Sequence, residues 1–213
     1  MELFKIEACM GNKGCPNSAN NTSLLIEKIL EISQQENITD FIASKVKGPI
    51  RQHNCFKVGV ANCPNACSQV QITDFAVIGK VKVEIDKSSC INCGRCVKFC
   101  FENALILSNG ELEFNISNCI GCGMCVKACK EESIKITKKG FKISAGGKLG
   151  RHAMLAIDIS DFAAETETLE IFRKILKFYK KHSIAGERLG AIFQRLNIKN
   201  TVDLSECIRN IRI

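Results

Sequence analysis

The chain has 213 residues, of which 46% are apolar and 24% are charged, which is typical of a soluble protein with one or two domains. No apolar run approaches a membrane span, and the N-terminus lacks the apolar core of a signal peptide. The formal net charge is +8, but no basic patch interleaved with aromatic residues accompanies it. We therefore expect a cytoplasmic protein that binds neither nucleic acid nor membrane and keeps its fourteen cysteines reduced.

The first predicted elements surround a cysteine pair. Residues 2–8 are predicted to form a strand that ends at Cys9, and Cys15 follows after a glycine-containing loop. Thr22 or Ser23 is a candidate cap for a helix with apolar residues on one face, and residues 37–54 are predicted to be a polar connection. The apolar residues of this helix are Leu24, Leu25, Ile29, Leu30 and Ile32.

A second cysteine pair follows the next predicted strand. Residues 56–61 are predicted to form this strand, and Cys63 and Cys67 come directly after it. Because each pair lies where a strand ends, both pairs are expected at the same edge of a sheet. Four thiolates on two loops can hold a 4Fe–4S cube. A structural zinc site is the alternative, although gaps of five and three residues are poor zinc spacings.

Two cysteine runs with one spacing lie between residues 88 and 130, with gaps of two, two and three residues in each run. In such runs three thiolates wrap one iron–sulfur cube, and the fourth cysteine ligates the other cube. The predicted ligands are Cys90, Cys93, Cys96 and Cys129 for one cube, and Cys119, Cys122, Cys125 and Cys100 for the other.

This segment resembles a bacterial two-cluster ferredoxin, although Phe101 and Lys130 stand where proline is usual. Zinc and disulfides are the alternatives. Zinc ligands come as two separated doublets, and disulfides are rare in chains without a secretion signal. Three cubes with their thiolates would remove about six units of positive charge, so the loaded protein would be only mildly basic.

Strands are also predicted at residues 81–85 and 154–159, and two helices around residues 169–179 and 189–196. The order of elements predicts an α+β fold, in which a mixed sheet packed with helices is interrupted by the ferredoxin-like insertion. Residues 1–86 and 138–213 are expected to form the sheet domain, and residues 87–137 the two-cluster ferredoxin domain.

Four segments together resemble the sirohaem-containing sulfite and nitrite reductases: KIEACMGNKGCPNS, VGVANCPNACSQVQITDFAVIG, GGKLGR at 146–151 and GERLGAIFQRL at 186–196. The resemblance implies that the two cysteine pairs hold a third 4Fe–4S cube, and that Cys67 bridges this cube to the iron of sirohaem. It also places Asn65 beside the cofactor. The ligands of the third cube would be Cys9, Cys15, Cys63 and Cys67.

Sirohaem carries many carboxylates, so its pocket needs cationic side chains and backbone N–H groups. Lys148 and Arg151 lie in a glycine-rich loop and are our candidates for these contacts, with a solvated loop as the alternative. Cys55 and Cys207 fit neither cysteine motif and are expected to be buried free thiols.

The implied function is an oxidoreductase subunit that reduces sulfite or nitrite, a small inorganic anion, with electrons from an unidentified donor protein relayed by the two ferredoxin-type clusters. Full-length relatives have two halves, and this sequence is expected to supply one. The other wall of the pocket would come from a second copy, from a different subunit, or be absent in an open site. A non-catalytic electron-transfer protein with three clusters is the alternative, and a redox sensor is the least favoured. No catalytic acid or base is identified.

Overall fold

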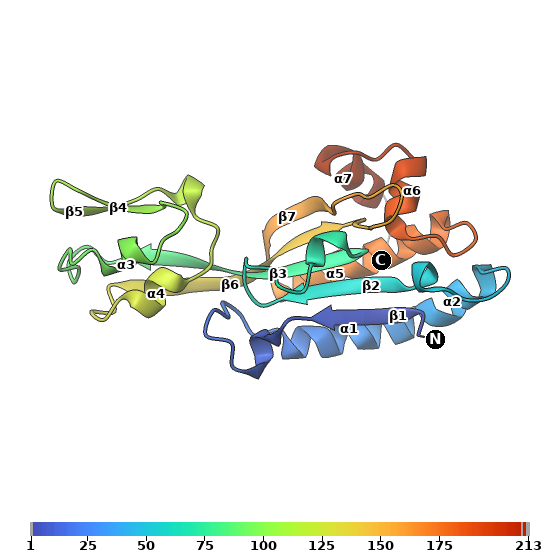
Figure 1. The fold of residues 1–213 in the computed structure, drawn as a ribbon, viewed down its shortest axis with the longest axis horizontal. Coiled ribbons are helices and arrows are strands. Elements are labelled where there is room, and N and C mark those ends of the chain that lie inside the picture. Colours follow the sequence, from blue (N-terminus) through green and yellow to red (C-terminus); the bar gives the residue numbers. More distant parts are fainter. Residues whose placement is uncertain (1, 210, 212–213) are drawn as a thin grey trace.

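A five-stranded mixed sheet forms the centre of the protein, in a computed structural model that describes residues 2–209 and 211 (Figure 1). The strand order is β1-β2-β3-β6-β7. β1, β2 and β3 are parallel, whereas β6 runs antiparallel to β3 and to β7. The strands are β1 (Phe4–Ala8), β2 (Phe56–Ala61), β3 (Phe75–Ile85), β6 (Ile134–Ala145) and β7 (Ile157–Ala163). The predicted α+β class with a mixed sheet is confirmed.

One core joins the sheet to five helices. Alternate residues of β2, β3 and β6 enter it, and the Phe75 ring of β3 packs against Phe172 of α5 with centroids 5.0 Å apart. Each fully buried side chain of this size contributes about 1.5–3 kcal/mol of stability. The helices are α1 (Ser23–Gln35), α2 (Ile38–Lys45), α5 (Glu165–His182), α6 (Leu189–Arg195) and α7 (Thr201–Arg209). None of the helices among the described residues is long and apolar enough to cross a membrane.

The opposite face of the sheet carries a smaller cluster. Ala61, Ala76 and Ile78 pack there against Ala66 and Val70 of the segment that connects β2 to β3. This segment contains the second cysteine pair and ends in the 3-10 turn η3 (Val70–Ile72). The segment that connects the parallel strands β2 and β3 therefore packs on the face of the sheet opposite the main helices.

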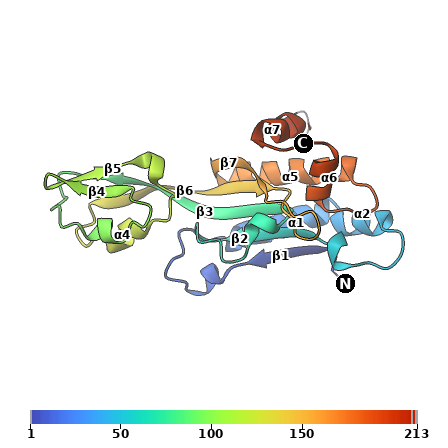
Figure 2. The same ribbon diagram turned by 45° about the horizontal axis from the view of Figure 1, so that its top comes forward.

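The segment between β3 and β6, residues 86–133, is here called the cysteine-rich module. β3 and β6 run on past the sheet as a two-stranded arm, with a bulge at Lys82/Val83, and the module lies at its tip, at one end of the molecule (Figures 1 and 2). It contains α3 (Arg95–Lys98), the hairpin of β4 (Leu105–Ser108) and β5 (Glu111–Phe114), and α4 (Met124–Ala128). β6 begins at Ile134, before the predicted domain boundary at 137.

Two predictions of local structure were wrong. Residues 37–54 are not simply a connection, because α2 spans Ile38–Lys45 and buries Ile38 and Ile42 at helical spacing in the main core. The strand predicted at 154–159 begins instead at Ile157, because Met154 pairs with Lys148 across a tight loop. The turn between β4 and β5 uses Asn109 and Gly110, both with positive φ, as a two-residue hairpin turn of type I′ requires.

Candidate metal centres

The two cysteine pairs lie at the same end of adjacent parallel strands, as the sequence predicts. β1 and β2 pair with Ala8 opposite Val60, so the chain reaches Cys9 and Cys63 at neighbouring points of one sheet edge. The Cys9 backbone N–H donates to the Val60 carbonyl at 3.0 Å. The parallel register of β1 and β2 therefore fixes the spacing between the two cysteine loops.

The Cys9 sulfur is surrounded by backbone donors. The N–H groups of Gly11 and Asn62 each donate to Cys9 Sγ at 3.3 Å. Hydrogen bonds to a ligand sulfur influence the potential of the cluster that it holds. These two N–H groups therefore fix the position of the Cys9 sulfur and would tune any cluster bound there.

A buried amide that the sequence analysis missed holds these loops together. Asn62 is 1% exposed, and its Nδ2 donates to the Asn20 carbonyl at 2.8 Å and to Asn12 Oδ1. Thr22 occupies the N-cap position of α1, but its side chain makes no capping hydrogen bond, because its hydroxyl donates to Asn62 Oδ1 at 2.9 Å. The available signal was an asparagine placed directly after an apolar strand, next to the cysteine motif.

Cys63 lies among the other three cysteines of the two pairs, which we call the sheet quartet (Cys9, Cys15, Cys63 and Cys67). Burial raises the pKa of Cys63, and the nearby charges of Cys9, Cys15 and Cys67 raise it further. A bound cation would reverse this effect, because thiolates that repel one another are stabilised by shared positive charge. Cys67 is exposed, as is Asn65 in the same loop.

The cysteines of the module surround two separate small cavities. One is lined by the first-run quartet, Cys90, Cys93, Cys96 and Cys129. The other is lined by the second-run quartet, Cys119, Cys122, Cys125 and Cys100. Each cavity therefore takes three cysteines from one run and the fourth from the other run. Burial, together with the charges of Cys122, Cys119 and Cys100, raises the pKa of Cys125 to about 12.

A zinc ion and a four-iron cube differ in how they arrange their ligands. Among residues 2–209 and 211, no three or more His, Cys, Asp or Glu side chains converge so that they could hold one metal ion. Zinc needs four ligands at one point, whereas a four-iron cube keeps its thiolates apart because each binds a different iron. Cys55 is buried and Cys207 half-buried, and both lie outside the quartets.

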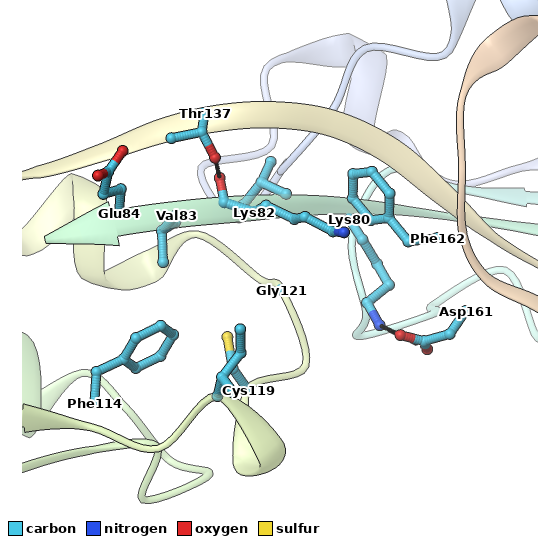
Figure 3. A pocket seen from close by; sticks show the side chains of 12 residues that line it. Lys80, Lys82, Val83, Glu84, Phe114, Cys119, Gly121, Thr137, Asp161 and Phe162 are labelled. Carbon is cyan, nitrogen blue, oxygen red and sulfur yellow. Dashed lines mark hydrogen bonds and ion pairs between the residues drawn. The ribbon is translucent and has the colours of Figure 1, made fainter.

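A groove opens between the module and the sheet (Figure 3). It consists of two pockets, of about 480 and about 430 Å³, which share Lys80, Cys119 and Asp161. In Figure 3, Lys80 points to Asp161, and its ammonium lies 2.7 and 2.8 Å from the two carboxylate oxygens. Phe114 and Phe162 add apolar surface to the larger pocket, so the groove is amphipathic.

The smaller pocket reaches the cysteine loop of the sheet. Pro64 and Gln71, which flank Cys67 in the chain, line it together with Lys142. The Lys142 ammonium pairs with Asp158 at 2.8 Å. An anionic ligand in this pocket would therefore meet two lysines that already have aspartate partners on β7.

Lys148 and Arg151 do not line these two pockets. The Lys148 ammonium donates to the His152 carbonyl within its own loop, and Arg151 is exposed. The loop nevertheless lies against the segment that follows Cys67, because the Gly147 N–H donates to the Thr73 carbonyl at 2.8 Å.

A buried ion pair joins the motifs at 146–151 and 186–196. Asp74 is fully buried, and Arg188 Nε lies 2.8 and 2.6 Å from its two carboxylate oxygens. Arg188 Nη2 also donates to the Gly147 carbonyl at 3.1 Å. A Cβ on Gly190 would lie 2.2 Å from the Gly146 carbonyl oxygen, so this contact requires glycine. These contacts hold the 146–151 loop and the start of α6 against Asp74, in the segment that connects Cys67 to β3.

Comparison with known proteins shows the family to which the chain belongs. Residues 2–206 match the family described as "Nitrite and sulphite reductase 4Fe-4S domain", and the chain belongs to that family. The coenzyme F420-dependent sulfite reductase of Methanocaldococcus jannaschii is 32% identical over 143 residues, covering 66% of this chain and 23% of that protein. A subunit of the anaerobic sulfite reductase of Salmonella typhimurium is 34% identical over 109 residues, covering 50% of this chain and 28% of that protein.

A solved structure shares the fold. The crystal structure of dissimilatory sulfite reductase I (DsrI) aligns with a TM-score of 0.66 and 20% identity, covering all of this chain and 53% of that chain. The chain therefore spans about a quarter of the curated relatives it matches and about half of the structural one.

Proposed function

We propose that this chain is the cluster-binding part of a sirohaem-dependent sulfite reductase, with nitrite as the alternative substrate. The observation that carries the proposal is the meeting of both cysteine pairs at one sheet edge, beside a groove that contains Lys80 and Lys142. Family membership and the names of both curated relatives favour sulfite.

In this proposal the sheet quartet holds one 4Fe–4S cube, and the two quartets of the module hold two more. The N–H groups of Gly11 and Asn62 hold the Cys9 sulfur in place. The fourth cysteine of each run ties the two halves of the module together, because it reaches the cavity of the other run. Such a set of sites suits transfer of single electrons.

The chain fits sirohaem in part. Cys67 is exposed, so its sulfur is free to contact a second group, and Asn65 lies beside it in the loop. The adjoining groove offers apolar surface and lysines that could exchange aspartate for cofactor carboxylates. Bound sirohaem would supply an iron that takes the sulfur of sulfite. Lys148 and Arg151 remain candidates for carboxylates at the rim.

In this proposal a second subunit or a second copy would complete the pocket; the anaerobic sulfite reductase relative is itself named as a subunit. We place the protein in a reducing compartment such as the cytoplasm, where thiols can be loaded with iron. A separate protein would donate the electrons. The alternative, a three-cluster electron carrier, is favoured by one observation, namely that Lys80 and Lys142 are already neutralised by Asp161 and Asp158.

The test compares Cys67→Ser with Cys207→Ser in protein prepared without oxygen and supplied with sirohaem. We expect the unmodified chain and the Cys207 variant to bind sirohaem and, besides the sirohaem iron, about twelve cluster irons per chain. Cys67→Ser should shift the sirohaem absorption bands and lower the iron count, because it removes both a cluster ligand and the proposed bridge. Iron, sulfide and tetrapyrrole contents are measured together.

Two results would go against the proposal. If about twelve irons bind but no sirohaem does, even with a candidate second subunit present, the protein is an electron carrier. If Cys67→Ser leaves iron content and spectrum as in Cys207→Ser, the sheet quartet holds no cluster.

A further inference from the structure

A lysine of the module reaches the cysteine loop of the sheet domain. Lys127, on α4, donates from its ammonium to the carbonyl of Ser18 at 2.8 Å and also to that of Pro16. Pro16 directly follows Cys15 of the sheet quartet. Lys127 itself lies between Cys125 and Cys129 in the second run. The contact therefore joins two stretches that each carry predicted cluster ligands.

A second contact supports the same interface. The Val81 N–H of β3 donates to the Gly121 carbonyl at 2.9 Å, and Gly121 lies between Cys119 and Cys122. The Val81 side chain packs in one buried cluster with Cys63 and Ala19. The second run of the module thus lies against residues that contact the sheet quartet.

The internal repeat provides a comparison for Lys127. The same three residues occur in both runs, as Cys96-Val97-Lys98 and as Cys125-Val126-Lys127. Lys98 is exposed, and its side chain makes no hydrogen bond or ion pair with any residue that the structure describes. Of these two equivalent lysines, only Lys127 therefore contacts the sheet domain.

This contact matters because the module is carried on a narrow support. The arm has two strands and a bulge at Lys82/Val83, and two-stranded ribbons have little rigidity of their own. An ammonium held by two carbonyl oxygens is a charge-assisted contact with a defined direction. It can therefore restrain the module at a point away from the arm.

We infer that Lys127 is a positioning residue that holds the second-run quartet against the sheet quartet. This inference rests on the proposed function for its consequence. The second-run cluster would give one electron to the sheet cluster, being oxidised as the sheet cluster is reduced. The first-run cluster would take its electron from an external one-electron donor protein. No bond is formed or broken in these steps.

The test compares Lys127→Met with Lys98→Met, which removes the same charge from the equivalent position. Hydrogen exchange is measured on the amides of Ser18, Ala19 and Asn20, which are all hydrogen-bonded in the structure. In Lys127→Met we expect exchange about three- to tenfold faster, the factor expected for losing an exposed charge-assisted contact. Lys98→Met should match the unmodified chain, and iron content should stay the same in all three proteins.

A second measurement follows electrons into the sheet cluster after flash photoreduction of the module. Lys127→Met should slow this transfer, and Lys98→Met should not. If exchange in Lys127→Met equals that in Lys98→Met, the contact does not form and the inference fails. If exchange rises but electrons arrive at the unmodified rate, Lys127 is a structural contact only. If the proposed function is wrong, this appears in the sirohaem and iron contents. The hydrogen-exchange comparison still decides, independently, whether Lys127 makes its contact with the sheet domain.

Discussion

At the scale of single residues, the environment of Cys9 depends on Gly11, which has no side chain. Gly11 lies against Asn62, and an added Cβ would be 2.2 Å from Asn62 Cγ and 2.3 Å from its Cβ. Asn62 cannot move away, because it accepts from Thr22 and donates to Asn20. The glycine therefore allows the loop to bring its N–H to the Cys9 sulfur.

We predict that Gly11→Ala selectively empties the sheet quartet. The new methyl group must displace Asn62, which removes both N–H···S bonds and separates Cys9 from Cys63. Iron content should fall from about twelve to about eight per chain. The control is Gly14→Asn in the same loop. A Cβ added at Gly14 would have no other atom within 4 Å, and asparagine tolerates the left-handed backbone of this position. Equal iron contents in the two variants would show that this contact does not support the site.

The repeated spacing of the two runs predicted the cluster ligands of the module, whereas the ligand set of the sheet quartet was implied by the resemblance to the reductase family. Neither predicted Asn62, Asp74 or Arg188. Their roles arise from burial, which brings residues more than fifty positions apart into contact, as when Asn62 meets Cys9. A polar residue in a sequence gives no sign of whether it is buried, so the supporting residues become visible only in the fold.

At the scale of elements, the two cysteine runs build one module by repetition. Gly94 and Gly123 occupy equivalent positions, with φ of 69° and 71°, and each begins a short helix. Asn103 and Glu132, three residues after each fourth cysteine, both have left-handed backbones. The turns therefore form without the proline that is usual in this motif, although Phe101 is left 86% exposed.

The pairing of cysteines across the runs gives a prediction that uses double variants. Cys90→Ser with Cys129→Ser should remove one cube and leave about eight irons, because both cysteines line the same cavity. Cys119→Ser with Cys129→Ser should remove two cubes and leave about four. If each run instead held its own cube, the two iron counts would be exchanged. Iron and sulfide analysis of protein reconstituted without oxygen distinguishes the two patterns.

Strands ending at cysteines were predictable because apolar alternation is strong in β1 and β2. The helix α2 was missed because only two of its eight residues, Ile38 and Ile42, are buried. Of its remaining residues Phe41 packs partly buried against Tyr179, and the others are polar or small enough to be typical of a loop. Tertiary packing, which supplies most helical stability, decided its conformation.

At the scale of the whole molecule, two cores are joined by one arm. The main core contains residues of the sheet and of α1, α2, α5, α6 and α7, and none from residues 86–133. The module has its own core around Leu105, Leu112 and Ile134, with five of its cysteines packed in or against it. Val83 and Ile85 of the arm pack against this second core, and Val83 also packs against the cluster of Ala19, Cys63 and Val81 on the sheet side.

This division predicts that the sheet domain folds without the module. Residues 83–137 can be replaced by Asn-Gly, a pair that favours two-residue hairpin turns, because Lys82 and Lys138 are partners across β3 and β6. The shortened chain should unfold cooperatively and bind about four irons, held by the sheet quartet. Cys67→Ser in the shortened chain should lower this content further. A folded but iron-free product would mean that the quartet is no cluster site or needs Lys127 and Gly121 to form. An unfolded product would mean that the main core depends on the module, contrary to the separation of the two cores.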